Sequence, residues 1–215
     1  MNIGIVGSGI VAQTLGAGFL KHGHTVMLGT REPKKLADWQ SQHSGVKLGS
    51  FADAAKFGEL VVLAVKGEVA LGVARKVADA LAGKPVIDTT NPIADAPPVN
   101  GVLKYFTSLD DSLLEQLQKA CPKARFVKAF SSVGAAKMVN PKFAGGPPTM
   151  FICGNDGAAK QTVTKILDQF GWETLDLGAA EAARAIEPLA MLWCIPGFLK
   201  NEWTHAFKVL HEGKS

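Results

Sequence analysis

The stretch NIGIVGSGIVAQTLGAGFL, residues 2–20, joins a short apolar run to a longer apolar segment through a glycine-rich turn. The run at 2–6 predicts a buried β-strand, and the longer segment predicts a helix. Gly7 permits a tight turn out of the strand, Gly9 lets the backbone approach a pyrophosphate, and small Ala12 lets the helix pack closely on the sheet. This succession predicts a dinucleotide-binding fold whose helix start faces phosphates; a glycine-rich packing turn is the alternative.

The rest of the chain alternates between short strand-like runs and longer helical segments. Such alternation predicts a Rossmann-type α/β fold, with a doubly wound parallel sheet and helices on both faces. We expect the last two strands and the helix between them to extend that sheet. The predicted strands cover residues 2–6, 25–29, 46–48, 60–65, 85–88, 125–129, 149–153 and 173–176. The predicted helices cover residues 11–21, 34–42, 51–56, 69–81, 112–120 and 157–170.

A chain of 215 residues suits one α/β core with a small addition. We therefore predict a dinucleotide-binding domain at 1–178 and a small helical C-terminal segment at 179–215. The sequence after Gly178 is almost continuously helical, with an interruption expected at Pro196 and Gly197.

Residues 188–199, PLAMLWCIPGFL, are more apolar than one exposed helix can sustain. A second copy of the chain is the simplest partner that could cover such a surface. We therefore predict a homodimer in which Met191, Trp193 and Phe198 lie at or near the subunit contact. Burial of these side chains in the core of a single chain is the alternative.

Composition and charge narrow the classes of partner. With 47% hydrophobic and 20% charged residues, the chain resembles an ordinary globular protein, and no uninterrupted apolar stretch approaches the length of a membrane span. The net charge of +4 comes from scattered Lys and Arg residues, which favours small anionic ligands over nucleic acid. The opening MNIGIVG has no basic leader, and Cys121, Cys153 and Cys194 lack disulfide or metal spacing. We expect a soluble cytoplasmic protein with reduced thiols and without nucleic-acid or membrane partners.

The stretch LGTREPKKL, residues 28–36, ends the second predicted strand. A carboxylate at this place would bind the ribose hydroxyls of NAD and would repel a 2′-phosphate. The chain has Thr30 and Arg31 there, and a guanidinium can hold a phosphate with two parallel hydrogen bonds. With Lys34 nearby, these residues predict a site for NADP(H), and Glu32 is expected to point to solvent. A solvated helix start is the alternative, although cations at that position oppose the helix dipole.

Three further segments end a predicted strand and enter a loop at the carboxyl edge of the sheet, where folds of this type bind ligands. The first, LVVLAVKG at 60–67, places Val65 at this edge. The second, VIDTTNPI at 86–93, offers the Asn91 amide to the nicotinamide ribose or carboxamide, and Pro92 stiffens the loop. A turn formed by Asn and Pro for structural reasons is the alternative.

The third segment, KAFSSVGA at 128–135, is rich in small residues. Ser131, Ser132, Gly134 and Ala135 leave room for a flat ring above the nicotinamide. The first three are therefore candidate contacts of a small-molecule electron acceptor. A plain strand-to-helix connection is the alternative.

The histidines suggest neither a catalytic dyad nor a metal site. His22 and His24 flank Gly23 at a helix-to-strand turn, where helix capping is expected. His205 and His211 are expected on the C-terminal helix, without a carboxylate at metal-ligand spacing, so no metal is assigned to them.

Five segments, VGSGIVAQTL, LGTREPKK, DTTNPI, FVKAFSSVGAAKMVNP and FICGND, occur in this order over nearly the whole chain. In order and spacing they resemble the NADP-dependent oxidoreductases grouped with the coenzyme F420:NADP oxidoreductases. Membrane-tethered ferric reductases carry a similar cytosolic domain. The resemblance implies more about the hydride donor than about the acceptor. The implied cofactor residues are Ser8, Gly9, Ile10 and Val11 in the glycine loop, Thr30 and Arg31 at the 2′-phosphate, and Asn91 with the segment around Ala135 at the nicotinamide.

The resemblance implies an NADP(H)-dependent oxidoreductase that transfers a hydride between NADPH and a flavin-like acceptor such as coenzyme F420. Such a transfer needs close stacking and orientation more than a protein acid, so no catalytic residue is assigned. Other acceptors, namely a ferric chelate, a quinone or an imine, are alternatives, as is a non-enzymatic NADP(H) sensor. An imine or hydroxyacid dehydrogenase would need a larger helical domain than 178–215 provides.

Overall fold

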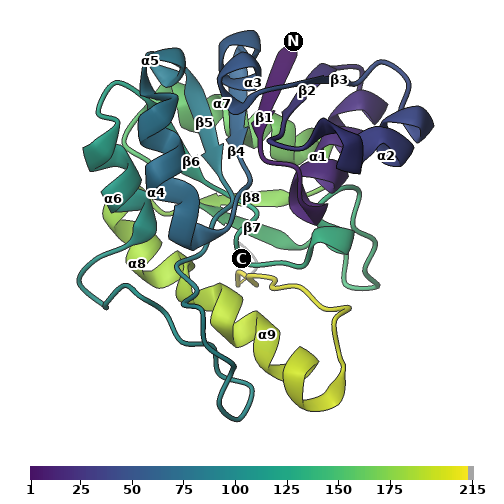
Figure 1. The fold of residues 1–215 in the computed structure, drawn as a ribbon. Helices are drawn as coiled ribbons and strands as arrows, with labels where there is room; N and C mark the ends of the chain where they lie inside the picture. Colours follow the sequence, from purple (N-terminus) through teal and green to yellow (C-terminus); the bar gives the residue numbers. More distant parts are fainter. Residues whose placement is uncertain (213–215) are drawn as a thin grey trace.

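The computed structural model describes residues 1–212 and contains a six-stranded parallel sheet in the order β3-β2-β1-β4-β5-β6 (Figure 1). β1 pairs with both β2 and β4, so the direction of winding reverses there. Ligands of such sheets bind beyond the carboxyl ends of the strands at this reversal. The strands are β1 Asn2–Val6, β2 Thr25–Gly29, β3 Lys47–Gly49, β4 Leu60–Leu63, β5 Pro85–Asp88 and β6 Arg125–Lys128.

Helices cover both faces of the sheet, which confirms the predicted doubly wound, Rossmann-type fold (Figure 1). One core lies under α1, α2 and α7, and the other lies under α3, α4, α5 and α6. In β4, Leu60 and Val62 belong to the first core, and Val61 and Leu63 belong to the second, so the strand is apolar throughout. The helices are α1 Ile10–Lys21, α2 Ala37–Gln42, α3 Phe51–Phe57, α4 Gly67–Lys76, α5 Ala78–Leu81, α6 Leu113–Ala120, α7 Gly157–Gln169, α8 Ala183–Ile186 and α9 Pro188–Lys200. Short 3₁₀ helices are η1 Pro33–Leu36, η2 Ala135–Lys137 and η3 Ala180–Ala182.

β7 Thr149–Ile152 and β8 Glu173–Asp176 pair with each other in a separate two-stranded parallel sheet. The prediction that these strands extend the main sheet is wrong. The two sheets meet in an isolated antiparallel bridge between Lys128 and Cys153. At this bridge the chain runs antiparallel to β6, so it does not continue the parallel ladder, and β7 pairs with β8 instead.

α9 continues through Pro196, so the predicted interruption at Pro196 and Gly197 is wrong. Pro196 has no amide hydrogen to donate to the Leu192 carbonyl, and Leu192 lies on the exposed side of the helix in the single chain. The helix ends at Asn201, whose φ is 57°. Trp203 then packs its ring against Gly197, and the chain reverses direction.

The residues after α9 form an irregular tail that returns to the β7–β8 sheet (Figure 1). The Thr149 amide in β7 donates to the Phe207 carbonyl at 2.9 Å. His205 and His211 lie in this tail, so the prediction that they lie on the C-terminal helix is wrong. Residues 213–215 of the predicted C-terminal segment lie outside the described residues.

The helical stretch Ala180–Lys200 is long and apolar enough, by length and composition, to cross a membrane. Core helices of soluble proteins pass the same test. The stretch is not uninterrupted, so it does not contradict the expectation about uninterrupted apolar sequence. Four charged residues lie in the stretch: Glu181, Arg184, Glu187 and Lys200. Two of them are paired with the rest of the fold, Glu187 with Lys128 and Arg184 with Glu115 of α6.

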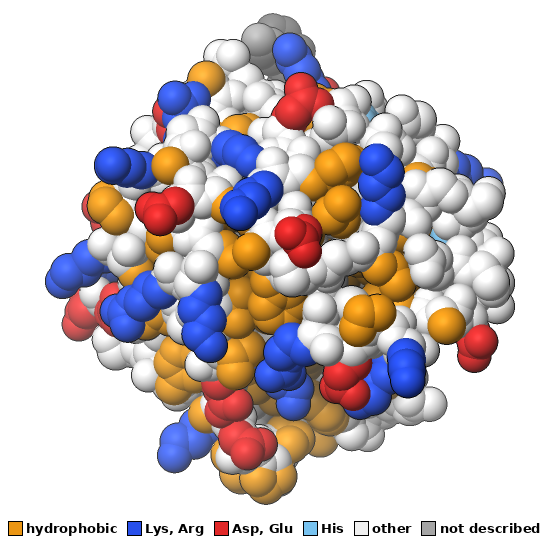
Figure 2. All heavy atoms as spheres, turned by 45° about the horizontal axis from the view of Figure 1, so that its top comes forward, with side chains coloured by type: hydrophobic (Ala, Val, Ile, Leu, Met, Phe, Trp, Pro, Cys, Tyr) orange, Lys and Arg blue, Asp and Glu red, His pale blue; other side chains and the backbone are white. Residues whose placement is uncertain are grey.

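One face of the molecule is shown in Figure 2. Lys and Arg side chains are dispersed over this face among acidic and apolar ones, and hydrophobic side chains gather towards its centre and lower part. The scatter of basic residues along the sequence thus persists on this folded surface.

Candidate functional site

The glycine loop leaves β1 at Gly7 and enters α1 after Gly9. Gly7 has a φ of 145°, and a Cβ atom there would collide with the Ala64 carbonyl oxygen. A Cβ atom at Gly9 would meet nothing of the protein within 4 Å. The fold itself therefore requires glycine at the first position and not at the second. The open space at Gly9 fits the predicted approach of a pyrophosphate to the backbone.

The amino end of α1 is open to a ligand. Its N-cap, Gly9, supplies no side-chain acceptor, so the amides of Ile10 and Val11 have no partner within the helix. The Ser8 carbonyl accepts a hydrogen bond from Gln13 Nε2 at 2.9 Å, which fixes the loop in front of the helix. Amides in this position can bind an anion, and the helix dipole adds to the attraction.

The end of β2 presents Thr30 and Arg31 side by side. Thr30 is buried; its amide donates to the Gly49 carbonyl at 2.9 Å, and its Oγ1 accepts from the Glu32 amide at 3.0 Å. These bonds fix the turn that carries Arg31. The Arg31 side chain is exposed and makes no ion pair within the described part of the chain.

Glu32 interrupts this basic turn, and its Oε2 lies 2.8 Å from Lys35 Nζ. The hydrogen bond and the charge of Lys35 lower the pKa of Glu32. Both side chains are exposed, which agrees with the expectation that Glu32 points to solvent. Because these two charges pair with each other, Arg31 and the exposed Lys34 remain the cations available to a 2′-phosphate.

The loops after β5 and β6 are joined by a hydrogen bond from Asn91 Nδ2 to the Ser131 carbonyl, at 2.8 Å. Two atoms at this junction, Asn91 Oδ1 and Ser131 Oγ, are buried without a hydrogen-bond partner among residues 1–212. Leaving a buried polar atom unsatisfied costs about 1–3 kcal/mol. Such atoms call for an explanation, and a ligand with a donor and an acceptor group supplies one. The arrangement is compatible with the predicted role of Asn91.

Phe130 turns the chain between β6 and Ser131. Its φ of 62° is unusual for a residue other than glycine, and its side chain is buried. The ring lies 6.0 Å from that of Phe170, and the amide donates to Met150 Sδ at 3.1 Å. A strained backbone persists where packing over-determines it, and such positions cluster at functional sites.

The remaining predicted residues lie along the same edge of the sheet. Val65 follows β4 and is half-buried, and Pro92 is buried, with its carbonyl accepting from the Phe106 amide at 2.9 Å. Ser132 is buried in the loop after β6, and Ala135 begins η2 in a half-buried position. The parallel strands thus bring the predicted cofactor and acceptor residues to one edge.

Gly134 lies against the indole of Trp193: a Cβ atom at Gly134 would be 2.5 Å from Trp193 Cη2. The expectation that Gly134 leaves room for an acceptor ring is corrected, because the chain's own side chain occupies that space. Trp193 is 7% exposed, and its Nε1 donates to the His205 carbonyl of the tail at 2.8 Å. Its predicted place at a subunit contact is corrected too, because the returning tail already covers it.

A buried charged cluster, formed by Lys128, Asp88 and Glu187, lies behind these loops and was not among the predicted site residues. Lys128 Nζ lies 2.6 Å from Asp88 Oδ2 and 2.8 Å from Glu187 Oε1, and it donates to the Thr90 carbonyl at 2.8 Å. Burial alone would lower the pKa of Lys128, but the two carboxylates outweigh it and hold that pKa above its ordinary value. The signal in the sequence was a lysine in the otherwise apolar run FVKAF.

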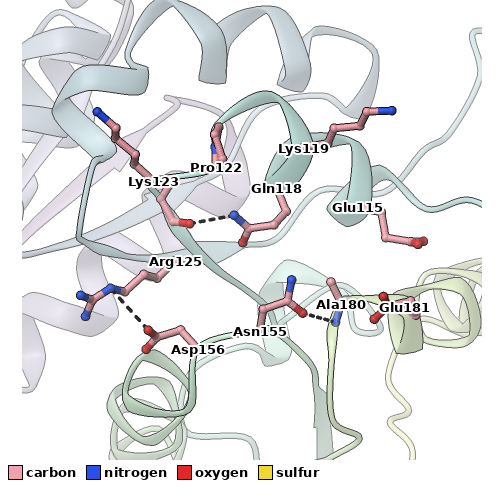
Figure 3. Close-up of a pocket in the computed structure, with 11 residues that line it drawn as sticks. Glu115, Gln118, Lys119, Pro122, Lys123, Arg125, Asn155, Asp156, Ala180 and Glu181 are labelled. Atoms are coloured by element: carbon pink, nitrogen blue, oxygen red, sulfur yellow. Dashed lines mark hydrogen bonds and ion pairs between the residues drawn. The ribbon is translucent and has the colours of Figure 1, made fainter.

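An open pocket of about 680 Å³ lies elsewhere, between the starts of β6 and α7 (Figure 3). Arg125 lines this pocket at the first residue of β6, whereas the candidate site follows the last residue of that strand. Three of its polar side chains pair within the lining: Arg125 with Asp156 at 3.5 Å, Gln118 with the Ala124 carbonyl at 2.9 Å, and Asn155 with the Ala180 amide at 2.9 Å. The pocket is therefore separate from the cofactor edge.

The fold and these loops define a class: an α/β protein that binds a dinucleotide at the carboxyl edge of its sheet, with cations suited to a phosphorylated ribose. Residues 2–92 match the family described as NADP oxidoreductase, coenzyme F420-dependent. A solved structure of a candidate F420-dependent NADP reductase from Arthrobacter is 34% identical, covers 98% of this chain and 100% of its own, and gives a TM-score of 0.91. The chain belongs to the family of F420-dependent NADP oxidoreductases.

Two curated relatives are longer than the part that matches this chain. Metalloreductase STEAP3 of Rattus norvegicus is 31% identical over 92% of this chain, which is 38% of that protein. The F420-dependent NADP reductase of Methanocaldococcus jannaschii is 31% identical over 65% of this chain and 62% of its own length. The chain thus spans less than two thirds of either relative. The predicted family is confirmed, and the family implies NADP(H) as the cofactor.

Proposed function

We propose that the protein is an NADP(H)-dependent oxidoreductase that transfers a hydride between NADPH and a flavin-like acceptor such as coenzyme F420. Membership of the family supports the donor and the class of reaction. The observation that carries the proposal is the pair of buried atoms, Asn91 Oδ1 and Ser131 Oγ, without a partner in the described chain. They follow the carboxyl ends of β5 and β6, the edge to which the glycine loop also belongs.

The phosphate groups of NADP(H) would be held at two places. The open amides of Ile10 and Val11, at the start of α1, would bind the pyrophosphate. Arg31, with Thr30 Oγ1 and Lys34, would bind the 2′-phosphate through charge-assisted hydrogen bonds. NAD(H) lacks that phosphate and would leave Arg31 without its partner, so this turn favours NADP(H).

The nicotinamide end would be oriented by Asn91 and Ser131. A carboxamide carries both donor and acceptor groups, so it can satisfy Asn91 Oδ1 and Ser131 Oγ together. NADPH, when bound, supplies the hydride, and the chemistry belongs to the cofactor. The task of the chain is to hold and orient the donor against the acceptor, which lowers the barrier without a protein acid or base.

An acceptor screen tests the proposal. NADPH oxidation is followed with a deazaflavin of the F420 type, a free flavin, a ferric chelate, a quinone and an imine. We expect the fastest turnover with the deazaflavin. The ferric chelate is the second candidate, because a relative that matches most of this chain is named a metalloreductase. NADPH binding without turnover of any acceptor would support a sensor instead, and a protein that does not bind NADPH would refute the proposal.

We also propose a homodimer formed through the outer side of α9 and the hairpin at 99–102. Gly101 of the hairpin lies against Leu199 of α9, so the two form one surface (Figure 1). Exposed apolar surfaces of this kind often mark protein contacts. The exposed apolar side chains of this surface are Val99, Val102, Leu192, Phe198 and Leu199.

Sedimentation tests the homodimer. Phe198→Asp is expected to shift the protein from dimer to monomer, with thermal stability kept because the side chain is 45% exposed in the single chain. Lys200→Asp, at the exposed end of the same helix, is the matched control and should sediment like the wild type. A wild type that sediments as a monomer at micromolar concentration would contradict the dimer.

A further inference from the structure

The buried charged cluster brings three charges together where water does not reach, since its side chains are at most 2% exposed. Lys128 ends β6, Asp88 ends β5, and Glu187 stands between α8 and α9. Moving ions out of water carries a large free-energy cost, and well-packed apolar residues in their place often give a more stable protein. Stability of the fold is therefore a weak explanation of this cluster.

The cluster fixes the backbone of Thr90, the residue before Asn91. Asp88 Oδ1 accepts from the Thr90 amide at 2.9 Å and from Thr90 Oγ1 at 2.6 Å. Lys128 donates to the Thr90 carbonyl at 2.8 Å. The amide, the carbonyl and the hydroxyl of Thr90 are thus all held by charged side chains, and hydrogen bonds to charged groups are the strong ones. The peptide that leads into Asn91 has little freedom.

Asn91 is bonded in turn to the loop that follows Lys128. Its Nδ2 donates to the Ser131 carbonyl at 2.8 Å, so the loop after β5 is bonded both to the end of β6 and to the loop after it. The first of these is the bond between Lys128 and Thr90, and the second is the bond between Asn91 and Ser131. Together they fix the positions of the two unpartnered atoms, Asn91 Oδ1 and Ser131 Oγ.

Glu187 connects the same cluster to the C-terminal helices. Its two carboxylate oxygens accept from the amides of Leu113 and Leu114 at 3.0 Å each, so this side chain caps the start of α6. Its backbone carbonyl accepts from the Tyr105 hydroxyl at 2.8 Å. Burial raises the pKa of Tyr105, which keeps that hydroxyl a donor. The cluster thereby links the cofactor edge to α6, α9 and the long loop after β5.

The Lys128 ammonium group has three hydrogens and three acceptors, namely Asp88, Glu187 and the Thr90 carbonyl. The side chain is also 0% exposed, so it does not touch a substrate and is not a catalytic acid. We propose that Lys128 is a positioning residue, which acts through Thr90 on Asn91 and so sets the nicotinamide end of the donor site. This inference rests on the proposed function, because NADP(H) is taken as the donor.

The test compares NADPH with adenosine 2′,5′-bisphosphate, two ligands that share the adenosine 2′-phosphate group. NADPH would reach both ends of the site, whereas adenosine 2′,5′-bisphosphate would reach the end formed by Thr30 and Arg31. Lys128→Met removes the bond to Thr90 and is expected to weaken NADPH binding about tenfold, the effect of losing a hydrogen bond to a charged group. Binding of the bisphosphate should change by less than about twofold, because that end of the site is remote from the substitution. Isothermal titration calorimetry measures both affinities.

Two further variants keep the test decisive. Lys119→Met removes a lysine from the exposed side of α6 and is expected to bind both ligands like the wild type. The double variant Lys128→Met/Asp88→Asn removes one charge of each sign from the cluster, and it decides the question if Lys128→Met does not fold. It is expected to show the same selective loss of NADPH binding.

The outcomes separate this inference from the proposed function. Selective loss of NADPH binding supports the positioning role, since a merely structural defect would weaken both ligands alike. Equal losses, no loss for either ligand, or failure of both Lys128 variants to fold would overturn that role. A wild-type protein that binds neither ligand would overturn the proposed function instead.

Discussion

The glycine loop and the paired loops around Asn91 and Ser131 reach the same edge of the sheet, yet they are built in different ways. The glycine loop depends on neighbouring residues: Gly7 adopts a φ of 145°, and Gly9 leaves open space in front of a helix. The paired loops are held by the buried charged cluster, whose members come from distant parts of the chain. The phosphate half of the candidate site thus rests on local backbone geometry, and the nicotinamide half rests on long-range pairing of charges. Substitutions in the two regions should therefore differ in what they damage.

The largest effect on binding is expected in the glycine loop. Gly9→Val should abolish NADP(H) binding while the protein stays folded, because the new side chain meets no protein atom near its Cβ and fills the space of the ligand. Gly7→Val is the matched contrast. It should lower the free energy of unfolding by about 3 kcal/mol or more, since it would collide with the Ala64 carbonyl at a strained φ. Calorimetric titration and thermal unfolding measure the two effects, and retained binding by Gly9→Val would contradict the proposed loop.

Substitution in the buried charged cluster should lower the stability of the protein as well as its affinity for NADPH, unlike Gly9→Val. Lys128→Met leaves two buried carboxylates without their cation, and it is expected to lower the free energy of unfolding by about 3–5 kcal/mol. Lys119→Met, on the exposed side of α6, should change it by less than about 0.5 kcal/mol. Denaturant unfolding of the three proteins provides the measurement. A stability like that of the wild type would mean that the cluster is not held together by Lys128.

The turn after β2 should determine the choice between cofactors. Arg31→Ala is expected to weaken NADP(H) binding by about 2–4 kcal/mol, because the 2′-phosphate loses a charge-assisted pair. NAD(H) binding should stay nearly the same, since that cofactor has no group for Arg31. Titration of both cofactors checks this, and equal losses for the two would remove Arg31 from the 2′-phosphate site. Lys35→Ala, whose charge is already paired with Glu32, is the matched control and should affect neither cofactor strongly.

The smallest expected effect is a loss of folding stability of the wild type at alkaline pH. Burial alone would lower the pKa of Lys128, but Asp88 and Glu187 raise it above the ordinary value of 10.5. A raised pKa in the folded state stabilises the protein fully below the unfolded value, and this contribution is lost as the pH rises through the folded pKa. The wild type should therefore lose stability above about pH 10.5 more steeply than Lys128→Met/Asp88→Asn. Parallel stability curves for the two proteins up to about pH 12 would show that Lys128 is not the group responsible.

Sequence patterns predicted those elements whose limits are set by nearby residues. β1, β2 and β5 have the predicted bounds, because each is an apolar run that is bounded by polar, glycine or proline residues. The pattern failed at Pro196, since the tolerance of a proline inside α9 depends on whether the Leu192 carbonyl can reach water. It also failed for β7, because an apolar run does not show which strand it will pair with, and β7 pairs with β8 in a separate sheet.

The sequence by itself determined the parts of the candidate site that lie within one stretch of chain. The glycine loop and the Thr30–Arg31 turn are of this kind, because their glycine spacing and their charges are visible in adjacent residues. Tertiary structure alone decided that Lys128 would meet Glu187, and that Trp193 would fill the space beside Gly134. Such pairings join residues far apart in the chain, so they leave no periodic or local pattern. Their energy arises only when folding removes the groups from water and brings them into contact.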